Sequence, residues 1–246
     1  WLAAQGREEA FVPLEADPDG VYDQEIEIDL SRVEPLVALP HQPDNVVPVR
    51  EVAGMEIQQV MFGSCTNSSL RDLESVAHIL GDGPVHPEVD AGVSPGSRQV
   101  LHHIAASGAL ERILSAGVRI LEVSCGACIG MGFAPPTEGV SLRTINRNFL
   151  GRCGHKTGKV CLVSPETAAA SAVEGRLTDP RDFAQRRGLK PFVFVQPERF
   201  HVDDRRFVFP PEDGSSIQIR RGPNIAPLPA MEPLGEMVCG LVLLKV

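Results

Sequence analysis

Short apolar stretches alternate with helix-like patterns between residues 56 and 175. Runs rich in Val, Ile, Leu and Met predict strands over 56–61, 118–123, 141–145 and 160–163, the second of them buried. Apolar residues recurring at i, i+3 and i+4, or an N-cap followed by small residues, predict helices over 68–80, 96–107, 109–115 and 165–174. This order predicts an α/β fold, a three-layer αβα sandwich with a mostly parallel sheet and helices on both faces.

The flanking regions carry weaker signals. Tyr22–Leu30 alternates polar and apolar residues, which predicts a half-buried edge strand, whereas the three prolines in 36–50 predict an extended, irregular segment. Toward the carboxyl end we expect further strands over 191–195, 205–209, 217–219 and 235–246. We therefore divide the chain into a surface segment (1–21), an α/β domain carrying the unusual loops (22–190) and a C-terminal extension (191–246).

Charge and cysteine usage restrict the function. The net charge of −9 argues against nucleic acid as the main partner, since phosphate binding needs excess Lys and Arg. No apolar run reaches the roughly 20 residues of a membrane span, and no segment resembles a signal peptide. The six cysteines are irregularly spaced and do not form a small disulfide framework. We expect a cytoplasmic protein whose thiols serve metal binding or chemistry.

Cys125 and Cys128 form a C-x-x-C pair directly after the predicted strand 118–123. Such a pair fits a redox dithiol, half of a zinc site or part of an iron–sulfur site. Cys65 likewise follows a predicted strand, and the carboxyl ends of parallel strands meet at one edge of a sheet. Three converging thiolates suit a zinc ion with one further ligand, or a [4Fe–4S] cluster that leaves one iron open as a Lewis acid.

A third loop, 146–152, follows the predicted strand 141–145. It contains Arg147 and Arg152, with Gly151 allowing a sharp turn between them. Guanidinium groups bind carboxylates through paired hydrogen bonds, so this loop is a candidate substrate site. Surface ion pairing of the two arginines is the alternative interpretation.

Together, the three loops resemble the signature segments of the aconitase superfamily. The matching segments are Gly63-Ser64-Cys65-Thr66-Asn67-Ser68-Ser69, Cys125-Gly126-Ala127-Cys128-Ile129-Gly130 and Asn146-Arg147-Asn148-Phe149-Leu150-Gly151-Arg152. The resemblance runs from about Tyr22 to Arg181. It implies that Cys65, Cys125 and Cys128 ligate a [4Fe–4S] cluster, that Arg147 and Arg152 bind substrate carboxylates, and that Asn146 lies near the cluster.

The resemblance also implies an activity, the removal and re-addition of water on a small tricarboxylate. Residues 134–137 and 222–225 look more like aconitate hydratases and homoaconitase-like enzymes than isopropylmalate isomerase, so aconitate hydratase (citrate–isocitrate isomerisation) is the expected type. The alternatives are a homoaconitase or 3-isopropylmalate dehydratase-type hydro-lyase, or a non-enzymatic zinc- or iron-binding module. The family enzyme is longer, so we expect this chain to be its third, cluster-bearing domain, inactive without the remaining domains, which hold the catalytic base.

The other cysteines and several histidines receive structural interpretations. Cys153 follows Arg152 directly and is predicted to be a bystander of the site. Cys161 and Cys239 fall in apolar segments and are predicted to be core thiols. The histidines near these motifs are expected to be structural or solvent-facing: His102, His103 and His155.

Overall fold

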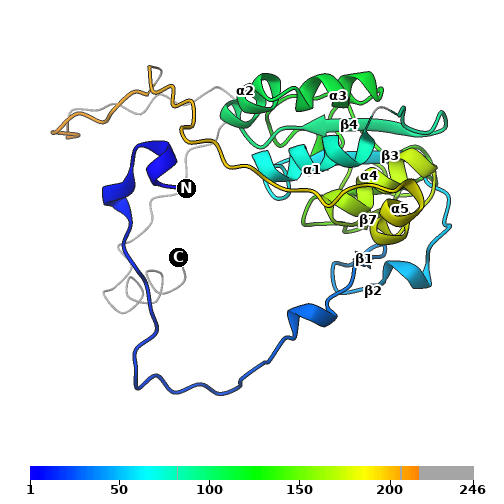
Figure 1. Ribbon diagram of the computed structural model, residues 1–246, viewed down its shortest axis with the longest axis horizontal. Coiled ribbons are helices and arrows are strands. Elements are labelled where there is room, and N and C mark those ends of the chain that lie inside the picture. Colours follow the sequence, from blue (N-terminus) through cyan, green and yellow to red (C-terminus); the bar gives the residue numbers. More distant parts are fainter. Residues whose placement is uncertain (82, 206, 216–246) are drawn as a thin grey trace. The chain divides into compact units, whose positions relative to one another are not determined.

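Seven strands form one sheet in the protein, whose computed structural model describes residues 1–81, 83–205 and 207–215 (Figure 1). The chain divides into two units, Trp1–Val202 and Asp203–Val246, and the strands found within the described ranges belong to the first. The boundaries predicted at residues 21 and 190 are not tested by this division and stay predictions.

The sheet has the order β2-β1-β7-β6-β3-β4-β5. The central strands β7, β6, β3, β4 and β5 run parallel, and the β1–β2 hairpin adds antiparallel strands at one edge. The strand bounds are β1 Leu36–Ala38, β2 Val46–Pro48, β3 Gln59–Gly63, β4 Asp90–Ser94, β5 Arg119–Ile120, β6 Val140–Arg143 and β7 Lys159–Leu162. The mostly parallel α/β fold is thereby confirmed.

Five α-helices accompany the sheet: α1 Leu70–Leu80, α2 Arg98–Ala106, α3 Ala109–Ser115, α4 Pro165–Glu174 and α5 Pro180–Arg187. Short 3-10 helices are η1 Ala3–Gln5, η2 Glu8–Ala10, η3 Leu30–Arg32, η4 Val49–Glu51 and η5 Ala127–Ile129. Local signals explain the predicted helices well. Ser69 and Asp72 form a capping box at the start of α1, and Ser164 with Pro165 starts α4.

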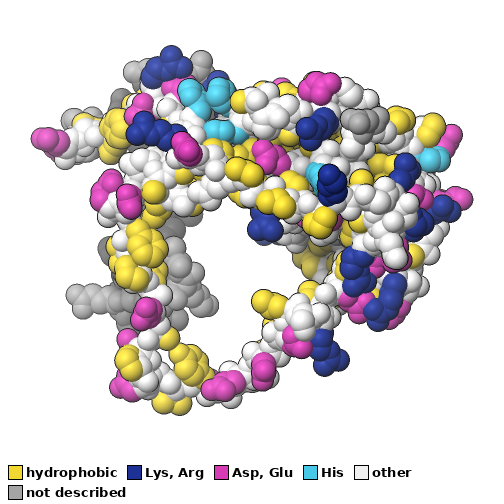
Figure 2. Space-filling model, viewed as in Figure 1, with side chains coloured by type: hydrophobic (Ala, Val, Ile, Leu, Met, Phe, Trp, Pro, Cys, Tyr) yellow, Lys and Arg dark blue, Asp and Glu magenta, His cyan; other side chains and the backbone are white. Residues whose placement is uncertain are grey.

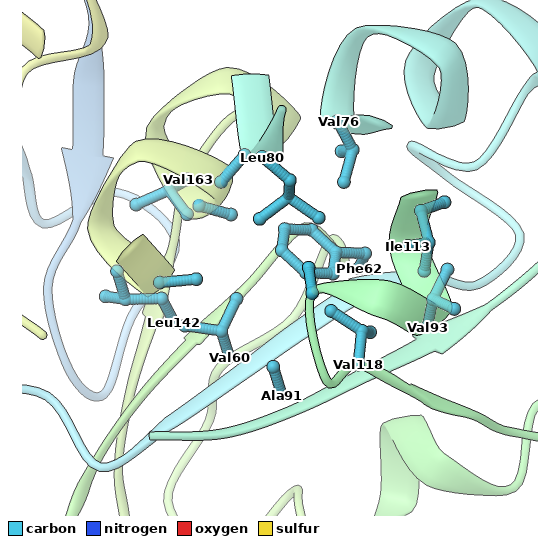
Figure 3. Close-up of a cluster of buried hydrophobic side chains, with 14 of the residues drawn as sticks. Val60, Phe62, Val76, Leu80, Ala91, Val93, Ile113, Val118, Leu142 and Val163 are labelled. Carbon is cyan, nitrogen blue, oxygen red and sulfur yellow. The ribbon is translucent and has the colours of Figure 1, made fainter. Parts of the chain in front are cut away.

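The main core lies between the sheet and helices α1, α3 and α4 (Figure 3). Phe62 of β3 lies at its centre and is fully buried together with Val60, its neighbour on the same face. Because side chains alternate across a strand, Met61 points to the opposite face. There it packs in a second cluster with Ala127, Cys128, Phe133, Ile145, Cys153 and Val160. The loops that carry the candidate site residues therefore cover this second face.

Several predicted strands are wrong. Tyr22–Leu30 and 191–195 form no strand, and their apolar side chains, such as Ile26 and Val193, are exposed. Residues 205 and 207–209 also form no strand, while 217–219 and 235–246 lie outside the described residues. An alternating pattern predicts which face of a strand would be buried, but a strand forms only where a neighbouring strand pairs with it. Among the described residues, no strand pairs with these segments.

Other predictions need smaller corrections. The segment 36–50 is not merely irregular, because it forms the β1–β2 hairpin with Pro48 at the end of the edge strand. The buried strand expected over 118–123 is reduced to the two exposed residues of β5, since β5 lies at the other edge of the sheet. Strand β4 and helix α5 were not predicted.

Candidate metal and substrate site

The loops that follow β3, β4 and β5 meet at the carboxyl edge of the parallel strands. They enclose a cavity of about 110 Å³ lined by Ser64, Cys65, Pro95, Gly96, Val123, Ser124 and Cys125. Cys65 and Cys125 thus share one cavity although they are far apart in the sequence. None of the lining residues is a carboxylate or a histidine, so sulfur and hydroxyl groups are the side-chain ligands available there.

Cys125 and Cys128 are in direct contact, with 2.7 Å between their Sγ atoms. Hydrogen bonding to Cys128 raises the pKa of Cys125. Burial acts to raise the pKa of Cys128, but hydrogen bonds from Cys125 and Ser64 and the charge of Arg152 together hold that pKa below its ordinary value. Of the two thiols, Cys128 is thus the one whose surroundings favour the thiolate form. A thiolate is the form that binds metal.

Cys65 is exposed, and its Sγ lies 3.8 Å from the Thr66 hydroxyl. Within the ranges that the structure describes, no three His, Cys, Asp or Glu side chains form a ready-made metal-binding group. The three predicted ligands are therefore brought together in part: two are in contact and the third lines the same cavity. Their role as ligands stays a prediction.

Backbone contacts hold the cysteine loops in place. Gly63 has φ +106°, and a Cβ there would overlap the carbonyl oxygen of Ser94, so β3 and β4 approach closely just before Cys65. The buried Ser94 hydroxyl donates to the Glu122 carbonyl oxygen at 2.7 Å. This bond fixes the segment that leads into Cys125.

The arginine loop is tied to the Cys65 loop through Thr144. The Thr144 hydroxyl accepts from the Gly63 N–H at 2.8 Å, and the Asn67 side-chain amide donates to the Thr144 carbonyl oxygen at 2.9 Å. After Thr144 the loop continues to Asn146 and Arg147, two of the predicted substrate ligands. Both are exposed, and Arg147 donates to Asn146 Oδ1 at 3.2 Å.

Arg152, the third predicted substrate ligand, is half-buried, and its positive charge acts on the thiols of Cys125, Cys128 and Cys153. Arg152 is therefore near enough for its charge to act on the thiol pair, whereas Arg147 is exposed and bonded to Asn146 of the same loop. Their assignment as carboxylate ligands stays a prediction.

Two buried polar residues of this region were missed. Asn148 is fully buried and donates to the carbonyl oxygens of Leu39 and Val160, which ties the arginine loop to β1 and β7. Arg143, the last residue of β6, is also fully buried and donates to the Ala127 carbonyl oxygen at 2.8 Å. A charged residue at the end of an apolar strand pattern was the signal that could have identified Arg143.

The remaining cysteines behave as core thiols where they are described. Burial raises the pKa of Cys153, and it raises the pKa of Cys161 to about 12. Cys161 is thereby confirmed as a core thiol, while Cys239 lies outside the described residues. Cys153 packs beside Cys128 in the second cluster, and its bystander role stays a prediction.

Some of the histidine side chains form a group on the surface at α2 (Figure 2). His102 of α2 stacks on His201 with 4.3 Å between ring centroids. His103 accepts from the His201 N–H at 3.0 Å, which is a structural role of the kind expected. His155 is exposed, and its Nδ1 lies 2.9 Å from the Thr157 hydroxyl.

Known proteins resemble this chain over the same segments. Residues 50–175 match the family model described as the aconitase family (aconitate hydratase). This match covers the three loops and the strands that position them, and the chain belongs to the aconitase family. None of the helices in the described ranges has both the length and the apolar character that a membrane crossing needs.

Several similar curated proteins share one name. The chain is 48% identical over 172 residues to the 3-isopropylmalate dehydratase large subunit 1 of Methanopyrus kandleri, covering 70% of this chain and 41% of that protein. It is 46% identical over 187 residues to the protein of the same name from Thermotoga maritima, covering 74% and 44%. A third relative, the large subunit from Sulfurihydrogenibium sp., is 45% identical over 194 residues, covering 78% and 45%. The chain thus spans less than half the length of these relatives.

Proposed function

We propose that this chain is the cluster-binding part of a 3-isopropylmalate dehydratase-type hydro-lyase. The names of the similar proteins favour this alternative over aconitate hydratase, which the residues at 134–137 and 222–225 had suggested. Those two short segments distinguish the two enzyme types less well than the comparison over 172 residues, because that comparison includes many more positions. Hydro-lyase chemistry of the aconitase type is common to both assignments.

The observation that carries the proposal is the thiol arrangement at the carboxyl edge of the sheet. Cys125 and Cys128 are in contact, Cys65 lines the adjoining cavity, and the described lining offers no carboxylate or imidazole. Sulfur-only coordination of this kind suits a [4Fe–4S] cluster. With three thiolates such a cluster supplies an open iron that acts as a Lewis acid when bound.

The arginine loop would supply substrate recognition. Arg152 lies beside the thiols, and the exposed Arg147 and Asn146 lie on the same loop. Two guanidinium groups suit a small hydroxy acid with at least two carboxylates, one held by each. In this role the two arginines orient the substrate and balance its charge near the anionic sulfurs.

No described residue of the site is an evident general base. The relatives are more than twice as long as the matched region and are called large subunits, so we infer that the acid–base groups lie on other domains or on a partner subunit. On this basis the chain by itself holds the metal and part of the substrate site, and turns over no substrate. Hydration activity of the purified 246-residue chain would contradict this inference.

Anaerobic reconstitution with iron and sulfide tests the proposal. We expect a brown chain with about four irons, and Cys65→Ser, Cys125→Ser and Cys128→Ser should each abolish stable binding. Cys161→Ala is the matched control, because it removes a buried thiol outside the site and should keep the iron. Cys153→Ala tests the bystander role and should also keep it.

A colourless chain with tightly bound zinc would instead support the non-enzymatic module. Substrate class is tested on the loaded chain by the change in the electron paramagnetic resonance spectrum on adding 3-isopropylmalate or citrate. A response to citrate alone would return the assignment to aconitate hydratase.

A further inference from the structure

Arg143 is the largest of the fully buried side chains in the described part of the protein. Within those residues no carboxylate lies within salt-bridge distance of its guanidinium. Burying a cation without an anionic partner is costly, and it is tolerated only where hydrogen bonds or other charges compensate. The groups that surround Arg143 therefore indicate the role of its charge.

The guanidinium connects the sheet to the loop of the C-x-x-C pair. On the sheet side it donates to Gln59 Oε1 at 2.9 Å and to the Ser141 hydroxyl at 3.1 Å. On the loop side it donates to the carbonyl oxygens of Ala127 at 2.8 Å and Phe133 at 2.7 Å. Together with a weaker contact to Met61 Sδ at 3.5 Å, these bonds provide a partner for each of the five N–H donors without any carboxylate.

The two loop carbonyls lie at opposite ends of the segment 127–133, which contains Cys128. This segment otherwise closes on itself, since the N–H groups of Ile129 and Met131 both donate to the Gly126 carbonyl oxygen. The planar guanidinium bonds both ends of the segment and both sheet partners at once, which an ammonium group with three donors cannot do. Arg143 thus fixes the loop that places Cys128 and Cys125.

The titratable groups whose charges act on Arg143 are thiols. Desolvation lowers the pKa of Arg143, while the charges of Cys153 and Cys128 act to raise it. The guanidinium carbons of Arg143 and Arg119 lie 5.9 and 5.2 Å from the centroid of the Phe133 ring, but Arg119 is exposed and paired with Asp90. Arg143 is therefore the buried positive charge that faces the sulfur site.

We infer that Arg143 is a positioning residue of the thiol site. It anchors segment 127–133 to the sheet, and it places an uncompensated buried positive charge beside the sulfurs, where it offsets the negative charge of thiolates and of the group they bind. The identity of that group rests on the proposed function, whereas the anchoring of the loop does not.

Hydrogen exchange in the metal-free 246-residue chain tests the anchor. In the wild-type chain the amides of 127–133 should exchange far more slowly than those of the exposed segment 11–30. Arg143→Lys and Arg143→Met should each speed exchange in 127–133 by about tenfold or more, because charge-assisted hydrogen bonds to the loop are lost. Arg119→Met removes only a long, exposed bond to the Gly132 carbonyl oxygen, at 3.5 Å, and should change this exchange far less.

The reduction potential of the reconstituted cluster tests the charge. Arg143→Met should lower the potential, because loss of a nearby positive charge disfavours adding an electron. Arg143→Lys should restore most of the wild-type potential although its loop exchanges faster, and Arg119→Met should not change it. If Arg143 had a purely structural role, Arg143→Lys and Arg143→Met would shift the reduction potential by similar amounts.

If amide exchange in 127–133 is unchanged in both Arg143 variants, Arg143 does not anchor this segment. If the reduction potentials of the wild type and Arg143→Met are equal, the charge of Arg143 does not act on the cluster. If neither variant folds, the wild-type chain decides, because exchange in 127–133 as fast as in 11–30 excludes an anchored loop. A wild-type chain that binds no iron would end the proposed function and, with it, the charge role, while the exchange result still tests the anchor.

Discussion

Gly130 lies against the carbonyl group of Cys153 so closely that a Cβ on Gly130 would overlap its oxygen. Gly130 also has φ +88°, in the left-handed region that favours glycine. The contact joins the loop of the C-x-x-C pair to the end of the arginine loop, backbone against backbone. The spacing between thiols and guanidinium groups is set there.

Gly130→Ala should therefore destabilise the protein more than the φ angle alone requires. Gly132→Ala is the matched control, because Gly132 has φ +70° but open space around its Cα. The control should cost about 1 kcal/mol of unfolding free energy, and Gly130→Ala clearly more, since the loops must separate. Urea unfolding measures both. Equal losses would show that the loops are not in close contact.

Removing the Ser94 hydroxyl should loosen the segment before Cys125. Ser94→Ala leaves the Glu122 carbonyl oxygen without its buried donor, and the expected cost is about 1–2 kcal/mol. Ser107→Ala removes a weaker bond, 3.4 Å from the Ile104 carbonyl oxygen, and should cost less. Denaturant unfolding compares the two, and we also expect faster alkylation of Cys125 in Ser94→Ala only. A larger loss in the control would contradict the assigned role.

The cysteines should differ sharply in reactivity in the metal-free chain. Cys161 has its pKa raised to about 12 by burial, so at pH 8 only about one thiol in ten thousand is ionised. Cys65 is exposed and should be alkylated first. Mass spectrometry after timed treatment with iodoacetamide should find Cys161 unmodified until denaturant is added. Early labelling of Cys161 would mean that the core opens locally.

Asp179 should make stability depend on pH at the acid end. Its side chain caps α5 and accepts from Arg181, one of the basic side chains around that helix, and the bond to Arg181 holds the Asp179 pKa below its ordinary value. A carboxyl whose pKa is lower in the folded state stabilises the fold above its unfolded pKa, and this stabilisation disappears as pH falls through the folded pKa.

Asp179→Ala should thus cost about 1–2 kcal/mol at pH 7, and the difference from wild type should shrink below pH 4. Asp179→Asn keeps a capping oxygen without the charge, so its unfolding free energy should lie between those of the wild type and Asp179→Ala. Thermal unfolding across the pH range measures the effect. A difference that grows toward low pH would show the opposite sign and contradict the assigned ion pair.

Local chemistry in the sequence was enough for much of the fold. The N-cap at Ser164 and the apolar face of 70–80 are signals within one helix. Helix α4 begins where its cap predicts, and α1 begins at Leu70, two residues after its predicted start. The positions of Cys65 and Cys125 after strands followed in the same way, because a strand and its next loop are neighbours in the chain.

Strand β4 and helix α5 lacked such signals. Asp90-Ala-Gly-Val-Ser has little intrinsic strand preference and becomes a strand because β3 and β5 supply its hydrogen bonds. Helix α5 is mostly charged and buries only Phe183, so its apolar pattern is faint. Tyr22–Leu30 is the reverse case, a strong pattern without a partner.

The sequence by itself determined the residues of the candidate site: three cysteines and two arginines, each in a loop after a strand. Only the tertiary structure decided how these loops meet. It brought Cys65 and Cys125 to one cavity, closed the cysteine loop onto Cys153 at Gly130, and joined that loop to Arg143 of β6 through the Ala127 carbonyl oxygen. These contacts join residues from separate strands and loops, so they depend on strand order and on loop packing, which no local pattern encodes.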